Sequence, residues 1–182
     1  MKFRLLIAAG VILLLLYVFF LRLYIPKDNE TVSDNDEIFA CGYVPYVDTF
    51  LCIDIDGKVL AVTNAANNDL PVIEGLKFQD FEIGCYLETD NNKVFKTIAS
   101  LVKLLNKYNL KGNFITKINV TNLEDIHLYT NNIDVAFGSA KDADEKIRTL
   151  KEIISNLHVA ENVKGLLDIS IIGRQYIFKV LT

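Results

Sequence analysis

The chain of 182 residues carries 19 lysines and arginines against 23 aspartates and glutamates, and 51% of its residues are hydrophobic. This hydrophobic content excludes an intrinsically disordered chain. Lys2, Arg4 and Arg22 lie in or beside one apolar run near the N-terminus, so the remainder has 16 basic and 23 acidic residues, a net charge of −7. Such an acidic remainder argues against nucleic acid and anionic lipid headgroups as partners, because both attract basic surfaces.

The first 25 residues predict a membrane anchor. Leu5–Leu21 contains seventeen consecutive uncharged residues, and with 23–25 it gives about 20 positions, enough for a bilayer core of roughly 30 Å. No small-residue cleavage site follows, so the segment resembles an uncleaved signal anchor more than a signal peptide. The alternative, a buried core helix, is disfavoured because the run has no polar face. Basic residues before it and acidic residues after it predict a cytoplasmic N-terminus and an extracytoplasmic remainder.

Residues 26–37 are polar and charged and predict a short linker, followed by one domain over 38–182. Alternating apolar residues bounded by turn residues predict strands in that domain. Asp56-Gly57 and Gly173-Arg174 predict tight two-residue hairpins. The expected strands are 38–47, 50–55, 58–62, 114–120, 126–129, 133–137, 166–172 and 175–181, with a compact apolar crossing at 70–76.

Two helices are predicted within the domain. The first has an apolar stripe that ends at Tyr108, with Asp90 or Asn91 as its cap and Gly112 after its end. The second starts with capping-box spacing among Ser139, Asp142 and Glu145. The two stripes are Val94, Ile98, Leu101, Leu105 and Tyr108, and Ile147, Leu150, Ile154 and Leu157. The fold class is therefore α+β: one N-terminal transmembrane helix, then an extracytoplasmic domain with a mostly antiparallel sheet and two helices.

Catalytic and metal-binding patterns are weak in this sequence. His127 falls in an expected strand, and His158 at a helix end is explained by the helix dipole. Asp54 and Asp56 resemble the start of a calcium loop, but Gly57 comes too early and no glutamate follows at the twelfth position. Cys41, Cys52 and Cys85 form no C-x-x-C motif; one extracytoplasmic bridge is possible, but three buried thiols are favoured. We therefore expect no enzyme, no metal, no cofactor and no small-molecule substrate.

The order of the motifs resembles the bacterial cell-division family FtsQ/DivIB, specifically its C-terminal β domain. The resemblance covers about 38–182 and is carried by CIDIDGKVL (52–60), LPVIEGL (70–76), NNIDVAFG (131–138), KDADEKIRTL (141–150) and GLLDIS (165–170). It implies a non-enzymatic component of the divisome, located in the cytoplasmic membrane at the division septum. It implies FtsL-like and FtsB/DivIC-like coiled-coil membrane proteins as partners in regulating septal peptidoglycan synthesis.

One feature departs from the family pattern. The family usually has a POTRA domain of about seventy residues between anchor and β domain, whereas here only about a dozen residues, 26–37, are available. We therefore expect either a relative without POTRA or a remnant of it within 38–47. Functions that belong to POTRA, such as recruitment by upstream division proteins, are not expected to transfer.

The last predicted strand is the candidate binding site. Tyr176, Phe178 and Val180 alternate to one face of 175–181, and Arg174 and Lys179 offer cations to an acidic partner. At a sheet edge the strand's unpaired backbone groups would accept a partner strand, as the family does at its C-terminal edge. The alternative for each of these residues is an ordinary core or rim position. Two other functions stay open: an anchored extracytoplasmic enzyme acting on the cell wall, or an anchored binding module of unknown target.

Overall fold

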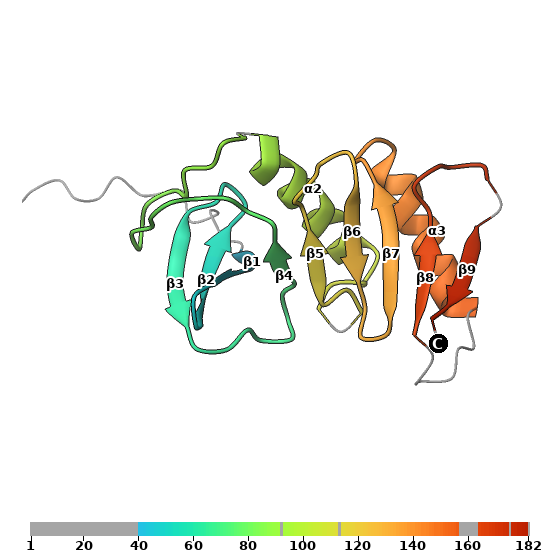
Figure 1. Cartoon of the computed structure of the whole chain (residues 1–182), viewed down its shortest axis with the longest axis horizontal. Helices are drawn as coiled ribbons and strands as arrows, with labels where there is room; N and C mark the ends of the chain where they lie inside the picture. The colour runs from blue at the N-terminus through green and yellow to red at the C-terminus, as the bar shows by residue number, and fades with distance from the viewer. Residues whose placement is uncertain (1–39, 92, 113, 157–163, 175, 182) are drawn as a thin grey trace, which may run out of the picture. The chain divides into compact units, whose positions relative to one another are not determined.

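The computed structural model describes residues 40–91, 93–112, 114–156, 164–174 and 176–181 (Figure 1). All of them belong to one compact unit, residues 38–182. Across these described stretches, every helix is too short or too polar to cross a bilayer. The predicted anchor and linker, 1–37, lie outside the described residues.

The described part of the chain forms nine strands and two helices. In chain order they are β1 (Ala40–Tyr46), β2 (Thr49–Asp54), β3 (Val59–Thr63), β4 (Val72–Glu74), α2 (Lys93–Lys107), β5 (Lys117–Asn119), β6 (Ile126–Tyr129), β7 (Ile133–Gly138), α3 (Ala143–Asn156), β8 (Gly165–Asp168) and β9 (Ile177–Val180). Every predicted strand is present, although several are shorter than expected. The 70–76 crossing contributes the ninth strand, β4.

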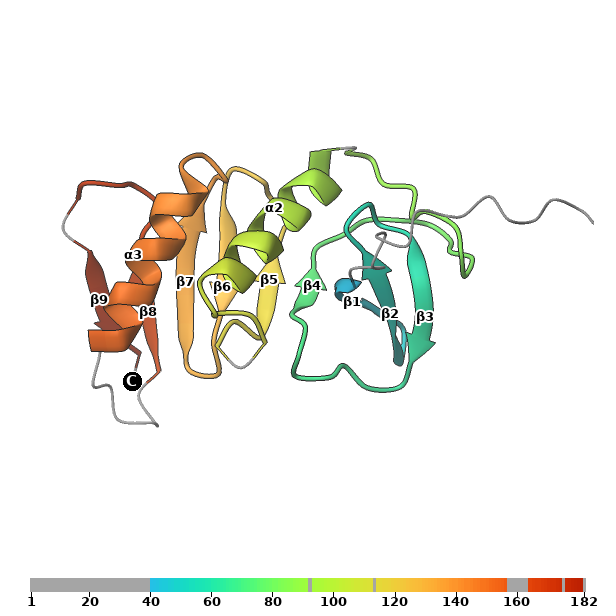
Figure 2. The same cartoon turned by 180° about the vertical axis from the view of Figure 1, so that it is seen from behind.

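All nine strands belong to one sheet in the order β3-β2-β1-β4-β5-β6-β7-β8-β9. Five neighbouring pairs are antiparallel, and β1–β4, β4–β5 and β7–β8 are parallel. A parallel pair needs a crossover connection, and α2 and α3 supply the crossovers for β4–β5 and β7–β8. Both helices lie on the same face of the sheet (Figure 2). The predicted α+β class, with a mostly antiparallel sheet and two helices, is therefore confirmed for this unit.

The predicted apolar stripes are the faces that the helices bury. On α2, Val94, Ile98, Leu101 and Leu105 are buried, and Tyr108 beyond its end is partly buried. On α3, Ile147 and Leu150 are fully buried and Ile154 is partly buried, whereas Leu157 lies outside the described residues. Together with alternate residues of the strands, they form one continuous core between the helices and the sheet.

The ends of α2 are fixed by two asparagines. The side-chain oxygen of Asn91 accepts a hydrogen bond from the Lys93 N–H at 3.0 Å, which identifies Asn91 as the cap. At the other end, Asn109 adopts a left-handed φ of 56°. The Leu110 N–H then returns to the Leu105 carbonyl at 2.8 Å. The residue with left-handed backbone that directly follows the helix end is therefore Asn109, and Gly112 lies three residues further on. Asparagine tolerates this conformation better than most residues other than glycine.

The start of α3 differs from the predicted capping box. Asp142 has a φ of 55° and its backbone carbonyl, rather than its side chain, accepts from the Lys146 N–H at 3.1 Å. The Lys146 side chain is 4% exposed, and its Nζ donates to the carbonyls of Phe137 (3.0 Å) and Ser139 (2.9 Å). A buried lysine therefore joins the first turn of α3 to the end of β7, a tie that the sequence pattern did not reveal.

The hairpin at Asp56-Gly57 is a three-residue turn and not the predicted two-residue turn. Of these two residues only Gly57 has a positive φ, 85°. The Asp54 N–H donates to the Lys58 carbonyl and the Gly57 N–H donates to the Asp54 carbonyl, the pattern of a turn closed by a glycine bulge. The Asp54 carboxylate also accepts from the N–H groups of Asp56 and Lys58 at 2.9 and 2.8 Å. The Asp54 carboxylate therefore stabilises the turn, which gives this residue a structural role without calcium.

The predicted antiparallel pairing of the last two strands is confirmed, but the tight two-residue turn predicted at Gly173-Arg174 is wrong. Asp168 pairs with Ile177, so residues 169–176 separate β8 from β9. The Asp168 carboxylate accepts from both the N–H and the hydroxyl of Ser170, at 2.9 and 2.7 Å. This side-chain turn ends β8 earlier than its apolar sequence suggested.

The joint between β1 and β4 is narrow. The parallel ladder has one register pair, Tyr43 with Val72, supported by a 3.0 Å bond from the Tyr43 N–H to the Pro71 carbonyl. Gly42 makes this approach possible, since a Cβ there would lie 2.7 Å from the Ile73 side chain. The two parts of the sheet are therefore joined by few main-chain hydrogen bonds.

Candidate partner-binding edge

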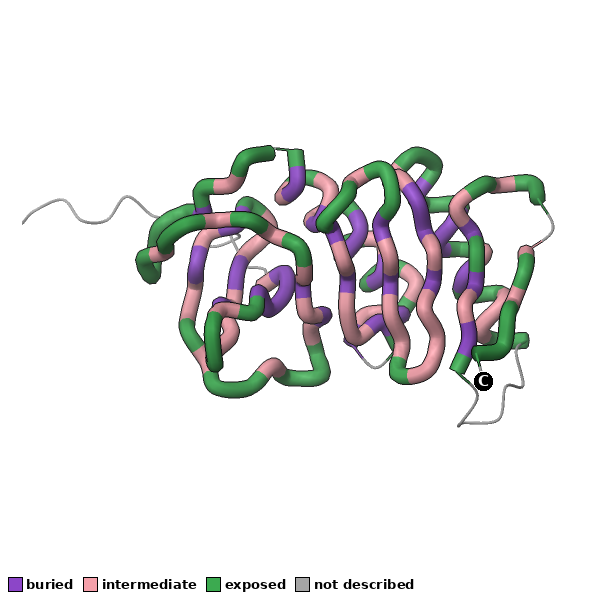
Figure 3. Tube along the Cα trace, in the orientation of Figure 1, coloured by how far each residue is buried: buried purple, intermediate pink, exposed green. Residues whose placement is uncertain are grey.

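β9 forms one edge of the sheet. Among the described residues it pairs with β8 alone, from Gly165–Val180 to Asp168–Ile177. Figure 3 shows β9 lined by exposed and half-buried residues, in contrast to the buried stretches in β6 and β7. The sequence-based expectation of a strand near the C-terminus is thus met by β9 (Ile177–Val180), and its place at the edge is a property of the tertiary structure.

The backbone of β9 presents polar groups away from the sheet. The Leu181 N–H donates to the Lys164 carbonyl at 2.8 Å, so residue 181 faces β8. In an antiparallel ladder the direction of these groups alternates, so Lys179 and Ile177 also face β8. The N–H and C=O groups of Phe178 and Val180 therefore point outward, where a further strand would pair.

The side chains of β9 divide between the two faces of the sheet. Tyr176 and Phe178 are partly buried and pack against the core, on the face that carries the helices. Val180 lies on that same face but is 59% exposed. Lys179 and Ile177 lie on the opposite face and are exposed. Of the predicted site residues, Tyr176 and Phe178 thus anchor β9, whereas Val180 and Lys179 are available to a partner.

Gly165 makes the anchoring possible. A Cβ at Gly165 would lie 2.2 Å from the Phe178 ring, so the ring packs directly over the glycine backbone on β8. Gly165 is itself buried. This glycine was not predicted as part of the site, since only the register of β8 and β9 brings it under Phe178.

One carboxylate at this edge, that of Asp168, is influenced by two cationic side chains. The hydroxyl and N–H of Ser170 lower the pKa of Asp168, and the charges of Arg174 and Lys179 lower it further. Arg174 and Lys179 are both exposed. The structure therefore places the two predicted cations within electrostatic reach of the same carboxylate, that of Asp168.

Exposed apolar side chains also collect here. Four of the nine large apolar side chains that are exposed in the described residues belong to the last part of the chain: Ile171, Ile177, Val180 and Leu181. Ile177 and Leu181 were missed as site residues. The sequence contained the pattern that would have identified them, because strand alternation places both residues beside Lys179 on the open face of the sheet.

The opposite edge, β3, is partly covered. The Val59 N–H donates to the Cys85 carbonyl at 2.9 Å, and the Gly84 N–H donates to the Val59 carbonyl at 2.8 Å. Residues 84–87 thus occupy the first part of this edge. In the described part of the chain, β9 is therefore the more open of the two edges.

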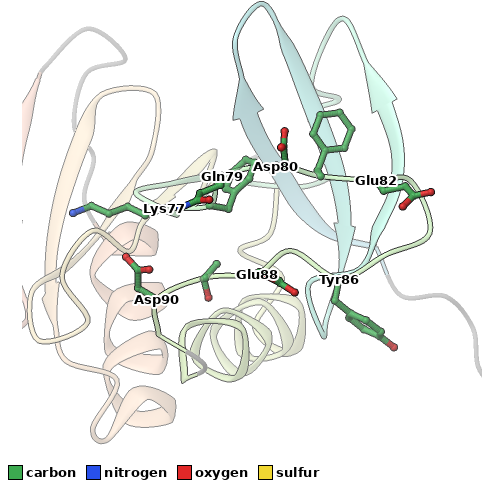
Figure 4. A pocket seen from close by; sticks show the side chains of 10 residues that line it. Lys77, Gln79, Asp80, Glu82, Tyr86, Glu88 and Asp90 are labelled. Carbon is green, nitrogen blue, oxygen red and sulfur yellow. The ribbon is translucent and has the colours of Figure 1, made fainter.

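An enzyme would need a catalytic set beside a cavity. An open hollow of about 760 Å³ lies along the segment 77–90 (Figure 4), but no histidine, cysteine or serine lines it. His127 instead lies on the open face of the sheet, with its Nδ1 2.6 Å from Asp134 Oδ1 and its Nε2 3.6 Å from Asp125 Oδ1. It lines none of the three hollows described in this unit. His158 lies outside the described residues.

The described stretches contain neither a metal-binding cluster nor paired cysteines. No three histidine, cysteine or acidic side chains there come together to hold a metal ion. The three cysteines are free, but the expectation that all three are buried is wrong, because Cys52 is only partly buried and Cys85 is exposed. Cys41 is buried, and its burial raises the pKa of the thiol to about 12, so the thiol stays protonated and unreactive.

Comparison with known proteins gives the family. Residues 42–172 match the family described as "Cell division protein FtsQ/DivIB, C-terminal". The chain belongs to the FtsQ/DivIB family. The resemblance found in its motifs is therefore confirmed.

Individual relatives agree with this assignment. The cell division protein DivIB of Clostridium botulinum (strain Hall) is 27% identical over 143 residues, which cover 78% of this chain and 54% of the relative. DivIB of Clostridium tetani is 28% identical over 156 residues, covering 82% of this chain and 57% of the relative. The chain thus spans about half the length of these relatives. Among solved structures, the major extracytoplasmic domain of the trans isomer of DivIB from Geobacillus stearothermophilus matches with 18% identity, 67% coverage of this chain, 89% of that chain and a TM-score of 0.39.

Proposed function

We propose that this member of the FtsQ/DivIB family is a non-enzymatic, single-pass membrane scaffold of the bacterial division machinery. Its N-terminus lies in the cytoplasm, and the unit 38–182 lies outside at the division septum. There it binds FtsL-like and FtsB/DivIC-like membrane proteins and helps to regulate septum formation.

The observation that carries the proposal is the outer backbone of β9, with which no other described strand pairs. Its outward N–H and C=O groups at Phe178 and Val180 offer a template for one more strand. Exposed Val180 and Lys179 flank that template on the two faces. An extended partner segment would gain affinity from main-chain hydrogen bonds and specificity from these side chains.

Proline substitution tests this mode of binding. In Val180→Pro the outward N–H is lost while the bonds to β8 remain, so we expect the protein to stay folded and to lose its partner. Lys179→Pro removes an N–H that faces β8 and should also lower the melting temperature. The readout is in-cell crosslinking from the extracytoplasmic unit, followed by identification of the captured proteins and melting of each variant.

A charge reversal provides a milder comparison. Lys179→Glu should weaken capture by about 0–1 kcal/mol, the range for an exposed ion pair. Lys151→Glu on the exposed face of α3 makes the same charge change away from the edge and should leave capture intact. Full capture of FtsL-like and FtsB/DivIC-like proteins by a folded Val180→Pro variant would place the binding surface elsewhere.

The orientation in the membrane has its own test. A reporter that is active only outside the cytoplasm, fused after Thr182, should be active, because the charge asymmetry around Leu5–Leu21 favours a cytoplasmic N-terminus. Activity of only a cytoplasmic reporter at that position would contradict the proposed orientation and, with it, the division role.

A further inference from the structure

The outer face of α2 carries a row of lysines. Lys93, Lys96, Lys103 and Lys107 are all exposed, and exposed Ser100 lies between the second and third. Their spacings of three, seven and four residues return to the same side of a helix. We call these four residues the lysine row. From Lys93 to Lys107 it extends about 21 Å along the helix axis at 1.5 Å per residue.

Three members of the row have no ion-pair partner within the described residues. Lys107 Nζ lies 2.7 Å from Asp144 Oδ1 on α3. Lys93, Lys96 and Lys103 form no comparable pair. Asp56 and Glu88 line the same hollow as Lys96, and Asp90 and Glu124 line the same hollow as Lys93. No ion pair within 4 Å joins these carboxylates to the two lysines in the described residues. Most of the positive charge on this face is therefore available to an external anion.

Helix stability does not account for the row. α2 contains no acidic residue in its first turn, where Lys93 stands instead, although a cation near the N-terminus of a helix is electrostatically unfavourable. The net acidic charge of the chain argues against a phosphate-bearing partner for the unit as a whole, but none of the fifteen residues of α2 is acidic, so this helix is a local basic surface. A merely soluble helix surface would mix both signs, as the exposed face of α3 does with Glu145, Arg148 and Glu152.

The chemistry of the face selects the kind of partner. None of the large apolar side chains that are exposed in the described residues lies on α2 or α3. A protein helix packed on α2 would need an apolar seam, and docking in a membrane interface would need apolar residues that insert. Flexible lysine ammonium groups in a straight row instead fit separate phosphate groups along a linear chain. Figure 2 shows α2 on the outer side of the sheet, where such a chain could lie along it.

We propose that the lysine row of α2 binds a linear phosphate-bearing polyanion aligned with the helix. This site is on the helix-bearing face of the sheet and is separate from the β9 edge. A division scaffold with both sites would hold its protein partners at one surface and an anionic polymer at another.

The test measures binding of the full-length chain, in a neutral detergent, to dye-labelled linear polyphosphate by fluorescence anisotropy at several salt concentrations. The row variant is Lys93→Gln, Lys96→Gln and Lys103→Gln together. The control variant is Lys141→Gln, Lys151→Gln and Lys164→Gln, which removes the same charge from exposed lysines elsewhere.

We expect the row variant to bind at least about tenfold more weakly at low salt. Its slope of log affinity against log salt should fall by about 2, since each phosphate contact on a flexible chain contributes roughly 0.7. The control should stay within about threefold, because its lysines form no row. Lys107→Gln alone should have little effect, as Asp144 already neutralises that charge.

Three results would overturn the proposal: equal losses in the row and control variants, wild-type affinity in the row variant, or equal binding of polyglutamate of matched length. Stronger binding to vesicles of phosphatidylglycerol and phosphatidylcholine than to polyphosphate would instead identify a membrane surface and would also overturn it. Partner capture through β9 should be unchanged in the row variant, so the two sites are tested independently.

Discussion

Lys146 offers the sharpest test of how α3 is attached to the sheet. Its buried Nζ donates to the carbonyls of Phe137 and Ser139 at 3.0 and 2.9 Å and lies 5.0 Å from the centre of the Phe137 ring. Lys146→Met keeps most of the aliphatic volume and removes both donors. A hydrogen bond to a charged group contributes roughly 1.5–3 kcal/mol, and the cost of burying the ammonium offsets part of it. We therefore expect a loss of about 2 kcal/mol in the free energy of unfolding.

The assay is urea unfolding of a fragment comprising residues 38–182, followed by far-UV circular dichroism. Lys146→Ala should cost more than Lys146→Met, by about 1–2 kcal/mol, because it also leaves a cavity. Lys151→Met, an exposed position on the same helix, should change stability by less than about 0.5 kcal/mol. A Met variant within 0.5 kcal/mol of the parent would refute the reasoning and indicate that water replaces the ammonium at both carbonyls.

The pH dependence gives a second readout of the same residue. Burial lowers the pKa of Lys146 below the value of 10.5 for a free lysine. The folded state therefore releases this proton at a lower pH than the unfolded state does. Between these two pKa values the unfolded state binds more protons, so this lysine's contribution to stability increases as pH rises through the folded-state pKa. The difference in stability between the parent and Lys146→Met should grow as the pH rises toward 10.5, and a constant difference would contradict this linkage.

Three further predictions concern the β8–β9 pair and metal dependence. Gly165→Ala should lower the melting temperature and cost about 1–3 kcal/mol by displacing the Phe178 ring, and an unchanged melting temperature would contradict the close packing. The hydrogen bonds from Ser170 lower the pKa of Asp168 below 3.8, so the contribution of the Asp168 carboxylate to stability is present above about pH 4 and is lost as the pH falls through the folded-state pKa. Asp168→Asn should therefore reduce the drop in melting temperature between pH 5 and pH 3. A chelator should leave the melting temperature unchanged, and a large drop would reveal a structural metal.

Local patterns predicted the elements well where packing and pattern agree. Ile126–Tyr129 was predicted with the bounds that the structure gives, since its two buried residues alternate with two half-buried ones. Both helices were predicted from stripes that become buried, because a one-sided apolar face has to cover a core. The family resemblance rested on the same motifs and was confirmed independently.

The misses have physical causes outside the local pattern. The turn at Asp56-Gly57 depends on the carboxylate of Asp54, and the end of β8 depends on that of Asp168, so side-chain hydrogen bonds override the simple turn rules. The buried position of Lys146 follows from the carbonyls at the end of β7, which come close only in the tertiary structure. The candidate site was predicted as a strand, but the division into anchoring Tyr176 and available Val180 required the register with β8.

The narrow joint between β1 and β4 also bears on how the unit opens. Strands β1–β3 are joined by hairpins of short sequence separation, whereas a single parallel register pair links them to β4. Cooperative units in native-state amide exchange tend to coincide with such supersecondary motifs. The amide groups that are hydrogen-bonded between β1, β2 and β3 should therefore become accessible to solvent together. The free energy of this opening should be below that of global unfolding. Those of β5, β6 and β7, which follow one another through continuous ladders, should exchange last.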